Sequence, residues 1–137
     1  MKTFIVDASV AIKWFIPEKG SIEAIKLLSN KYRLLAPDII RPEVGNILWK
    51  LYSRKLLSGD EAVKIIENFL SLTIEICSSD SLLMSALEIA IATGRTVYDS
   101  LYLALAVEQN AAMITADQRF ANALKNTGLT KFIIVLH

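Results

Sequence analysis

Short β-type runs that alternate with helical stretches are the feature that most constrains the fold. Five such runs recur along the chain, and they are residues 4–6, 34–36, 73–77, 112–115 and 132–136. Parallel strands need a long crossover between them, usually a helix, and such sheets are covered on both faces. The sequence therefore predicts an α/β fold with a parallel sheet of about five strands and helices on both faces. At 137 residues the chain has the size of one domain, which we expect to span residues 1–137.

The composition narrows the class of protein. Apolar residues make up 53% of the chain, yet no uncharged apolar run approaches the roughly 18 residues of a membrane span, so we expect no membrane association. The apolar surplus is expected to cover a subunit or partner interface. Fifteen basic and fourteen acidic residues leave a net charge of +1, so only a local basic patch could bind a nucleic acid. The single cysteine, Cys77, excludes an intrachain disulfide, and no targeting segment is visible, so a cytoplasmic protein is expected.

Four carboxylates lie at the ends of the predicted elements. Asp7 follows the first strand and Asp117 follows the fourth, while Glu43 lies in the first turn of a predicted helix. Asp99 lies at the start of another helix, where Thr96 and Asp99 have the spacing of a capping box, so that Asp99 is expected to reach back to the helix start. Each acid taken alone has a structural explanation, because acids at helix starts cap the helix or interact favourably with its dipole.

The four acids are nevertheless expected to meet. Doubly wound sheets gather strand ends and the following helix starts at one edge, which is where ligands bind. Capping and dipole interactions explain each acid separately, but they do not explain why four acids share one edge. Repulsion between the acids would cost stability there unless a cation lay among them. Carboxylates without a histidine or thiolate nearby are hard oxygen ligands, which favour Mg²⁺ or Mn²⁺ over Zn²⁺. The sequence therefore predicts a Mg²⁺ or Mn²⁺ site formed by Asp7, Glu43, Asp99 and Asp117.

Four segments carry a resemblance to a known family. They are FIVDASVA at residues 4–11, PEVGNIL at 42–48, TVYDSLYLALA at 96–106 and ITADQRF at 114–120, and they follow one another in the family's order. In this pattern, which covers essentially the whole chain, the protein resembles the PIN domain family, and within it most of all the VapC toxins of prokaryotic toxin–antitoxin pairs. No departure from the pattern falls on an acid, whereas residues 53–81 match only in helical character.

The resemblance implies an activity and a set of partners. It implies a Mg²⁺- or Mn²⁺-dependent endoribonuclease, and with it an RNA substrate, a homodimer and a cognate VapB-type antitoxin. It also implies that Asp7 and Asp99 are the firmest metal ligands, and that Glu43 and Asp117 bind the metal directly or through water. The small hydroxyl positions that support the family's site are matched here by Ser9 and Thr115.

Binding of RNA at such a site would need positive charge around it, because carboxylates repel phosphate. The candidates for phosphate contacts, each weighed against an ordinary solvated role, are Lys13, Arg41, Lys50, Arg54, Arg95 and Arg119. Two alternatives keep the fold but change the role: a non-catalytic interaction module, and a housekeeping nuclease that processes RNA. A phosphoryl-accepting receiver domain is disfavoured, because Asp7 stands alone after the first strand and no lysine follows the fifth.

Overall fold

A five-stranded parallel sheet lies at the centre of the computed structural model, which describes all residues from 1 to 137. Its strand order is β3-β2-β1-β4-β5, and every neighbouring pair of strands is parallel. The strands are β1 (Lys2–Val6), β2 (Tyr32–Pro37), β3 (Glu75–Cys77), β4 (Ala112–Thr115) and β5 (Ile133–Val135). The predicted parallel α/β architecture is confirmed.

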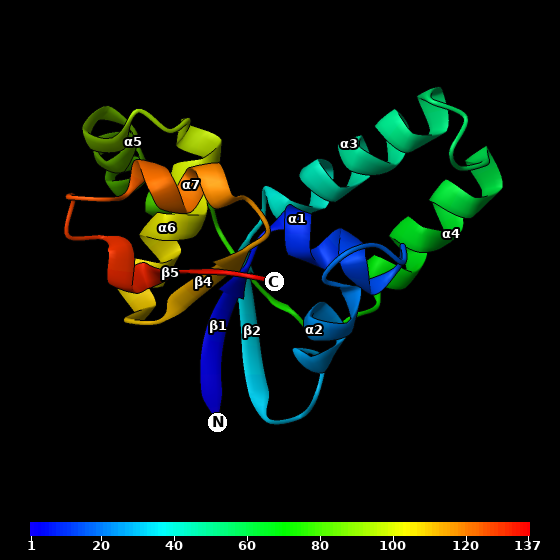
Figure 1. The fold of residues 1–137 in the computed structure, drawn as a ribbon, viewed down its shortest axis with the longest axis horizontal. Coiled ribbons are helices and arrows are strands. Elements are labelled where there is room, and N and C mark those ends of the chain that lie inside the picture. Colours follow the sequence, from blue (N-terminus) through cyan, green and yellow to red (C-terminus); the bar gives the residue numbers. More distant parts are fainter.

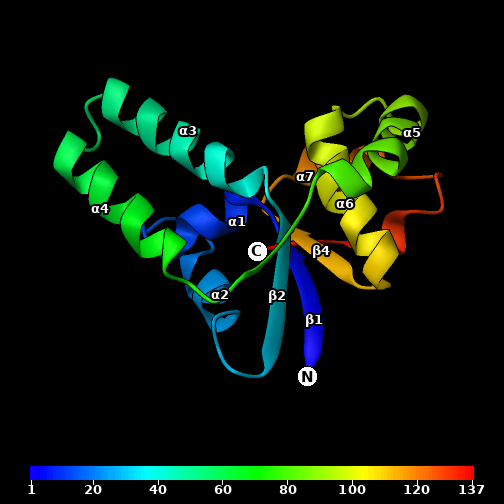
Figure 2. The ribbon, with the colours of Figure 1, turned by 180° about the vertical axis from the view of Figure 1, so that it is seen from behind.

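Seven helices connect the strands: α1 (Ala8–Ala11), α2 (Ser21–Lys26), α3 (Ile40–Ser53), α4 (Gly59–Leu70), α5 (Leu83–Thr93), α6 (Val97–Gln109) and α7 (Gln118–Ala123). Short 3₁₀ turns add residues Ile12–Trp14, Asp80–Leu82 and Thr130–Phe132. Helices α1 to α4 lie to one side of the sheet and α5 to α7 to the other (Figure 1, Figure 2). This division follows from the right-handedness of parallel crossovers, because the chain moves outward from β1 to β3 and then returns across the sheet to β4. None of the helices is both long and apolar enough to cross a membrane.

The core is built on the central strand β1. Ile5 of β1 pairs in register with Leu35 of β2 and with Met113 of β4, and all three side chains are buried. Strands that are covered on both faces carry continuous apolar runs, as the triplet Phe4–Val6 does here. Burial of each such side chain contributes about 1.5–3 kcal/mol to the stability of the fold. The buried core therefore holds the carboxyl ends of the strands in place.

Helix α6 is the main helix on the side of the sheet that carries α5 to α7. Its residues 100–106 are all buried, and it packs against β1, β2 and β4. Because protein surrounds most of α6, apolar side chains cover its faces on every side instead of forming one stripe. The hydroxyl of Thr96 caps its start by accepting a hydrogen bond from the N–H of Asp99 at 3.1 Å. The first turn of α6 is thereby held at the edge of the sheet.

The strand order reverses between β1 and β4. In doubly wound sheets this reversal is the place where ligands bind, just beyond the carboxyl ends of the strands. Asp7 directly follows β1, and Asp117 lies two residues after the end of β4. The fold therefore places two of the predicted acids at its switch point.

Candidate functional site

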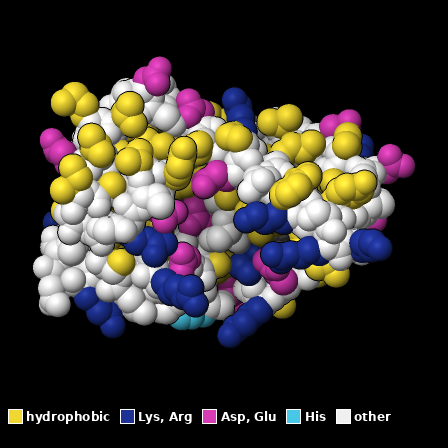
Figure 3. Space-filling view, turned by 90° about the horizontal axis from the view of Figure 1, so that it is seen from above, with side chains coloured by type: hydrophobic (Ala, Val, Ile, Leu, Met, Phe, Trp, Pro, Cys, Tyr) yellow, Lys and Arg dark blue, Asp and Glu magenta, His cyan; other side chains and the backbone are white.

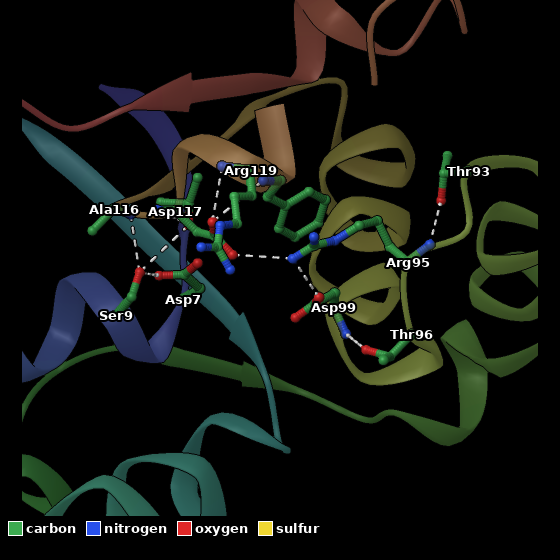
Figure 4. Close-up of polar contacts among 11 residues, drawn as sticks. Asp7, Ser9, Thr93, Arg95, Thr96, Asp99, Ala116, Asp117 and Arg119 are labelled. Atoms are coloured by element: carbon green, nitrogen blue, oxygen red, sulfur yellow. Dashed lines mark hydrogen bonds and ion pairs between the residues drawn. The ribbon is translucent and has the colours of Figure 1, made fainter. Parts of the chain in front are cut away.

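Asp7 is held at the tip of β1 by short-range hydrogen bonds. It caps α1, and its Oδ1 accepts the N–H of Val10 at 3.1 Å. The same oxygen accepts the hydroxyl of Ser9 at 2.5 Å (Figure 4). The side chain is buried, and this burial is the main reason why the pKa of Asp7 is raised above its ordinary value. Hydrogen bonds from the Ser9 hydroxyl and the Val10 N–H, together with the nearby hydroxyl of Thr115, offset part of the rise, and the negative charge of Asp99 adds to it.

Ser9 and Thr115 tie the tips of β1 and β4 together. The Ser9 hydroxyl accepts the N–H of Ala116 at 3.0 Å, and it lies 3.4 Å from the hydroxyl of Thr115. Thr115 in turn accepts the N–H of Asp117 at 3.1 Å. The hydroxyls of Ser9 and Thr115 therefore fix Asp7 and Asp117 relative to each other. The supporting position that the resemblance implies for these two hydroxyls is where the structure has them.

Asp117 and Asp99 share one positive partner. Asp117 caps α7, and its Oδ1 accepts the N–H groups of Arg119 at 3.0 Å and Phe120 at 3.4 Å. Its other oxygen, Oδ2, pairs with Nη2 of Arg95 at 3.0 Å, and the same nitrogen lies 2.9 Å from Oδ2 of Asp99 (Figure 4). The expected capping-box contact from Asp99 back to the helix start is wrong, because its carboxylate pairs with Arg95, and a charge-assisted hydrogen bond outweighs one to a neutral amide.

Glu43 is fixed from the opposite helix layer. It lies in the first turn of α3, and its Oε1 accepts the hydroxyl of Tyr102 at 2.5 Å. Burial is the main cause that raises the pKa of Glu43, and the charges of Asp99 and Asp7 raise it further, while the Tyr102 hydrogen bond lowers it. Burial and the neighbouring Glu43 carboxylate hold the pKa of Tyr102 far above its usual range, so this hydroxyl stays protonated and donates a hydrogen bond to Glu43.

The four acids thus gather at one edge of the sheet, although in two linked groups. The charge of Asp99 raises the pKa of Asp7, and the charges of Asp99 and Asp7 raise the pKa of Glu43, so these three acids lie near one another. Asp117 joins Asp99 through Arg95. Figure 3 shows acidic side chains in a hollow on this face of the molecule, with basic side chains beside them and apolar side chains on both flanks.

The side chains as placed do not form a closed metal site. No group of three or more Asp, Glu, His or Cys residues lies close enough together to hold one ion. The reason is visible in the contacts, since Arg95 holds Asp99 and Asp117 while Tyr102 holds Glu43. The chemistry of the donor set still fits a hard divalent cation: Asp7 and Glu43 are carboxylates with raised pKa values, and neither has a positive partner.

Two residues have roles at the site that the sequence did not predict. Tyr102 was not predicted at all, although it lies three residues after Asp99 on α6, a spacing that places both on one helix face. Arg95 was predicted only as a phosphate contact, but its guanidinium is engaged with Asp99 and Asp117.

The other predicted basic residues differ in availability. Lys13 pairs with Glu18 at 2.9 Å and also donates to the carbonyl of Lys19. The four that are exposed without an ion-pair partner are Arg41, Lys50, Arg54 and Arg119.

Fold and site together define an α/β protein with an acidic cluster at the switch point of a parallel sheet. The family model described as the PIN domain matches residues 4–125, which is most of the chain. The chain therefore belongs to the PIN domain family, and the resemblance seen in its sequence is confirmed.

The chain is also similar to individual proteins of known name. Ribonuclease VapC3 of Pyrobaculum aerophilum is 34% identical over 119 residues, which are 85% of this chain and 91% of that protein. The crystal structure of PAE2754 from Pyrobaculum aerophilum matches with a TM-score of 0.73 at 21% identity, covering 96% of this chain and 89% of that one. VapBC2 from Rickettsia felis, solved with a DNA fragment from the VapBC2 promoter, matches with a TM-score of 0.67 at 13% identity, covering 98% and 99%. At these identities the two structures establish a shared fold.

Proposed function

We propose that this protein is a Mg²⁺- or Mn²⁺-dependent endoribonuclease and the toxin of a type II toxin–antitoxin pair. The observation that carries the proposal is the meeting of Asp7, Glu43, Asp99 and Asp117, from four separate segments, at the switch point of the sheet. The 34% identity to a protein named as a ribonuclease of the VapC group supports the same activity.

The acids would hold the cation, with Asp7 and Asp99 as the firmest ligands and Glu43 and Asp117 binding directly or through water. When bound, such a cation supplies Lewis-acid activation of the phosphate and of a water molecule for in-line displacement. Ser9 keeps Asp7 oriented through the hydrogen bond at Oδ1, which leaves Oδ2 free of protein donors.

Glu43 is the acid best suited to take a proton from the attacking water. Its raised pKa makes it a stronger base than an exposed glutamate, and Tyr102 occupies only Oε1, so Oε2 is free to accept. Tyr102 is a positioning residue, because its proton stays on the hydroxyl.

RNA would bind through positive charge next to the acidic cluster. Arg41 lies two residues before Glu43, and Arg119 lies two residues after Asp117, so both exposed arginines are attached to the backbone near the acids. Lys50 in the last turn of α3 and Arg54 at the C-cap of α3 place further positive charge at the end of this helix, away from Glu43. Contacts of this kind position the RNA backbone and carry no base specificity.

The surface also offers room for protein partners. Large apolar side chains are exposed on α5, among them Met84 and Ile91, and on the α3–α4 hairpin, among them Trp49. Groups of exposed large apolar side chains are typical of interaction sites, which supports a homodimer and a VapB-type antitoxin as partners. A non-catalytic interaction module would use the same surfaces, and a housekeeping RNA-processing nuclease would use the same acids. Activity measurements separate the first alternative from the proposal, and the presence of an antitoxin partner separates the second.

The test is cleavage of total cellular RNA with Mg²⁺ or Mn²⁺, with new 5′ ends mapped in wild type, in Asp99→Asn and in the presence of a chelator. Glu108→Gln is the matched control, because Glu108 is an exposed acid at the other end of α6. We expect cuts at a few defined sites in wild type and in Glu108→Gln, and none in Asp99→Asn or with chelator. Cuts that persist in Asp99→Asn would overturn the proposed site. Protein that binds Mn²⁺ but cuts no RNA would favour the interaction module.

A further inference from the structure

Arg95 lies between two of the proposed metal ligands. A single nitrogen, Nη2, contacts Oδ2 of Asp99 at 2.9 Å and Oδ2 of Asp117 at 3.0 Å (Figure 4). The two acids come from different elements, the first turn of α6 and the loop between β4 and α7. One guanidinium therefore offsets part of the repulsion that these acids would otherwise exert on each other.

The backbone and the ring of Phe120 hold this guanidinium in place. Gly94 ends α5 in the left-handed conformation with φ of 78°, and the N–H of Arg95 then donates to the Thr93 hydroxyl at 3.2 Å. The guanidinium carbon lies 4.8 Å from the centre of the Phe120 ring, a cation–π contact. The Arg95 side chain is only 21% exposed, so the ion pairs are partly shielded from solvent.

The oxygen that Arg95 occupies on Asp117 is the one that a metal ion would need. Oδ1 of Asp117 already accepts two backbone N–H groups, from Arg119 and Phe120, and these cap α7. Oδ2 is the remaining oxygen, and Arg95 holds it. A cation could bind Asp117 through Oδ2 only if the guanidinium moved away.

One hydrogen-bond donor of Arg95 has no partner in this arrangement. Its Nε is buried and has no hydrogen-bond partner, which costs free energy. Asp7 and Glu43 remain without a positive partner while Arg95 is in place. A divalent cation carries more charge than one guanidinium and could contact these acids as well, so it would offset more of the negative charge of the cluster than Arg95 does.

We infer that Arg95 is a built-in competitor of the metal ion: it pairs with Asp99 and Asp117 in the metal-free protein and is displaced when a divalent cation binds. The inference rests on the proposed metal-dependent function and adds a residue that sets the metal affinity of the site.

Calorimetric titration with Mn²⁺ at constant pH and ionic strength tests the competition. Arg95→Met, which keeps much of the apolar stem but loses the charge, is expected to bind Mn²⁺ at least about tenfold more tightly than wild type, because the metal no longer has to displace two charge-assisted contacts. Arg95→Lys is expected to stay within about threefold of wild type, because Arg95 contacts both acids through one nitrogen that an ammonium can replace. Arg119→Met is the matched control, since it removes a positive charge from the same edge without breaking an ion pair.

Tighter binding in Arg95→Met alone supports the inference, and equal or weaker binding overturns it. A similar gain in Arg119→Met would also overturn it, because general electrostatics would then explain the change. Absence of Mn²⁺ binding in every variant, wild type included, would overturn the proposed function and the inference together.

A measurement on the unmodified protein guards against a variant that folds poorly. In metal-free ¹⁵N-labelled protein, the buried Nε–H of Arg95 is expected to give a signal protected from exchange with water. Addition of Mg²⁺ is expected to shift this signal and to remove its protection, because the displaced side chain enters solvent. A signal that stays protected and unshifted while the Asp99 amide responds to Mg²⁺ would show that Arg95 does not leave, and would overturn the inference.

Discussion

The hydroxyl of Tyr102 donates a 2.5 Å hydrogen bond to Oε1 of Glu43 and so joins the buried helix α6 to the first turn of α3. The two residues lie 59 positions apart in the sequence. Burial raises the pKa of both groups, and the hydrogen bond lowers the pKa of Glu43 because it favours the charged carboxylate. This contact therefore controls both the orientation and the protonation of one acid of the site.

Replacement of Tyr102 by Phe tests that control. The variant keeps the buried ring but loses the donor, so we expect kcat/KM for RNA cleavage to fall about 10- to 100-fold, as for loss of a residue that orients a metal ligand. The pKa of Glu43 should rise, and the acidic limb of the pH–rate profile should move to higher pH, because Glu43 must be ionised to act. Profiles of wild type, Tyr102→Phe and the exposed control Tyr98→Phe provide the measurement. An acidic limb that stays in place in Tyr102→Phe would contradict this account.

Asp7→Asn is expected to stabilise the metal-free protein at neutral pH while it abolishes cleavage. Oδ1 of Asp7 accepts both of its hydrogen bonds, from Ser9 and Val10, and the side-chain oxygen of Asn can accept the same two. What the variant removes is a buried negative charge that faces Glu43 and Asp99. We expect a gain of at least about 1 kcal/mol in the free energy of unfolding at pH 7.

The pH dependence of this gain follows from the raised pKa of Asp7. The protonated form is favoured by folding, so its stabilising contribution is complete below the unfolded-state pKa of about 3.9 and is lost as pH rises through the folded-state pKa. The advantage of Asp7→Asn should therefore be largest at pH 7 and approach zero near pH 4. Urea denaturation of both proteins between pH 4 and 8, with chelator present and the exposed Asp60→Asn as control, measures it. A variant that is less stable than wild type at pH 7 would refute the prediction.

Ser9→Ala should weaken both the fold and the site. The Ser9 hydroxyl donates to Asp7 and accepts the N–H of Ala116, so its loss leaves two groups without a partner at the junction of β1 and β4. We expect a loss of about 1–3 kcal/mol in stability and at least about a tenfold loss of kcat/KM. Thermal unfolding and cleavage assays are compared with those of Ser71→Ala, which removes an exposed hydroxyl at the end of α4. Equal behaviour of the two variants would mean that the strand tips are held by other contacts.

The arrangement of strands and acids could be predicted because both depend on local sequence signals. β4 was predicted with its observed bounds, since Ala112–Thr115 is an apolar run between Asn110 and Asp117, both of which favour turns or caps. Asp7, Asp99 and Asp117 all lie at element ends as predicted, because strand ends and helix starts are marked by the residues themselves. The edge of a parallel sheet then collects them whatever the details of packing.

The partners of these acids could not be predicted, because they depend on how the helices pack. Nothing local to Glu43 indicates that Tyr102 points at it, since that contact needs α6 and α3 to meet across the end of the sheet. Arg95 shows the same limit: its spacing from Asp99 permits an i,i+4 ion pair, but the second contact, to Asp117, forms only when α6 packs against β4.

The position of Asp99 and Tyr102 depends on the packing of α6, and a core substitution should separate stability from chemistry. Leu103 is completely buried in α6, so Leu103→Ala is expected to cost about 2–5 kcal/mol through lost burial and a residual cavity. Val107, on the same helix but 41% exposed, is the control, and Val107→Ala should cost less than about 1 kcal/mol. Because the Leu103 side chain cannot make a hydrogen bond or an ion pair with the acids, kcat/KM of the folded fraction at low temperature should stay within about threefold of wild type.

Urea denaturation measures the stability of Leu103→Ala, and cleavage assays at 10 °C and 37 °C measure kcat/KM. Loss of cleavage in folded Leu103→Ala at the lower temperature would show instead that the acids shift when α6 loses its packing, and that the geometry of the site is set by the core and not by the hydrogen bonds at the strand tips.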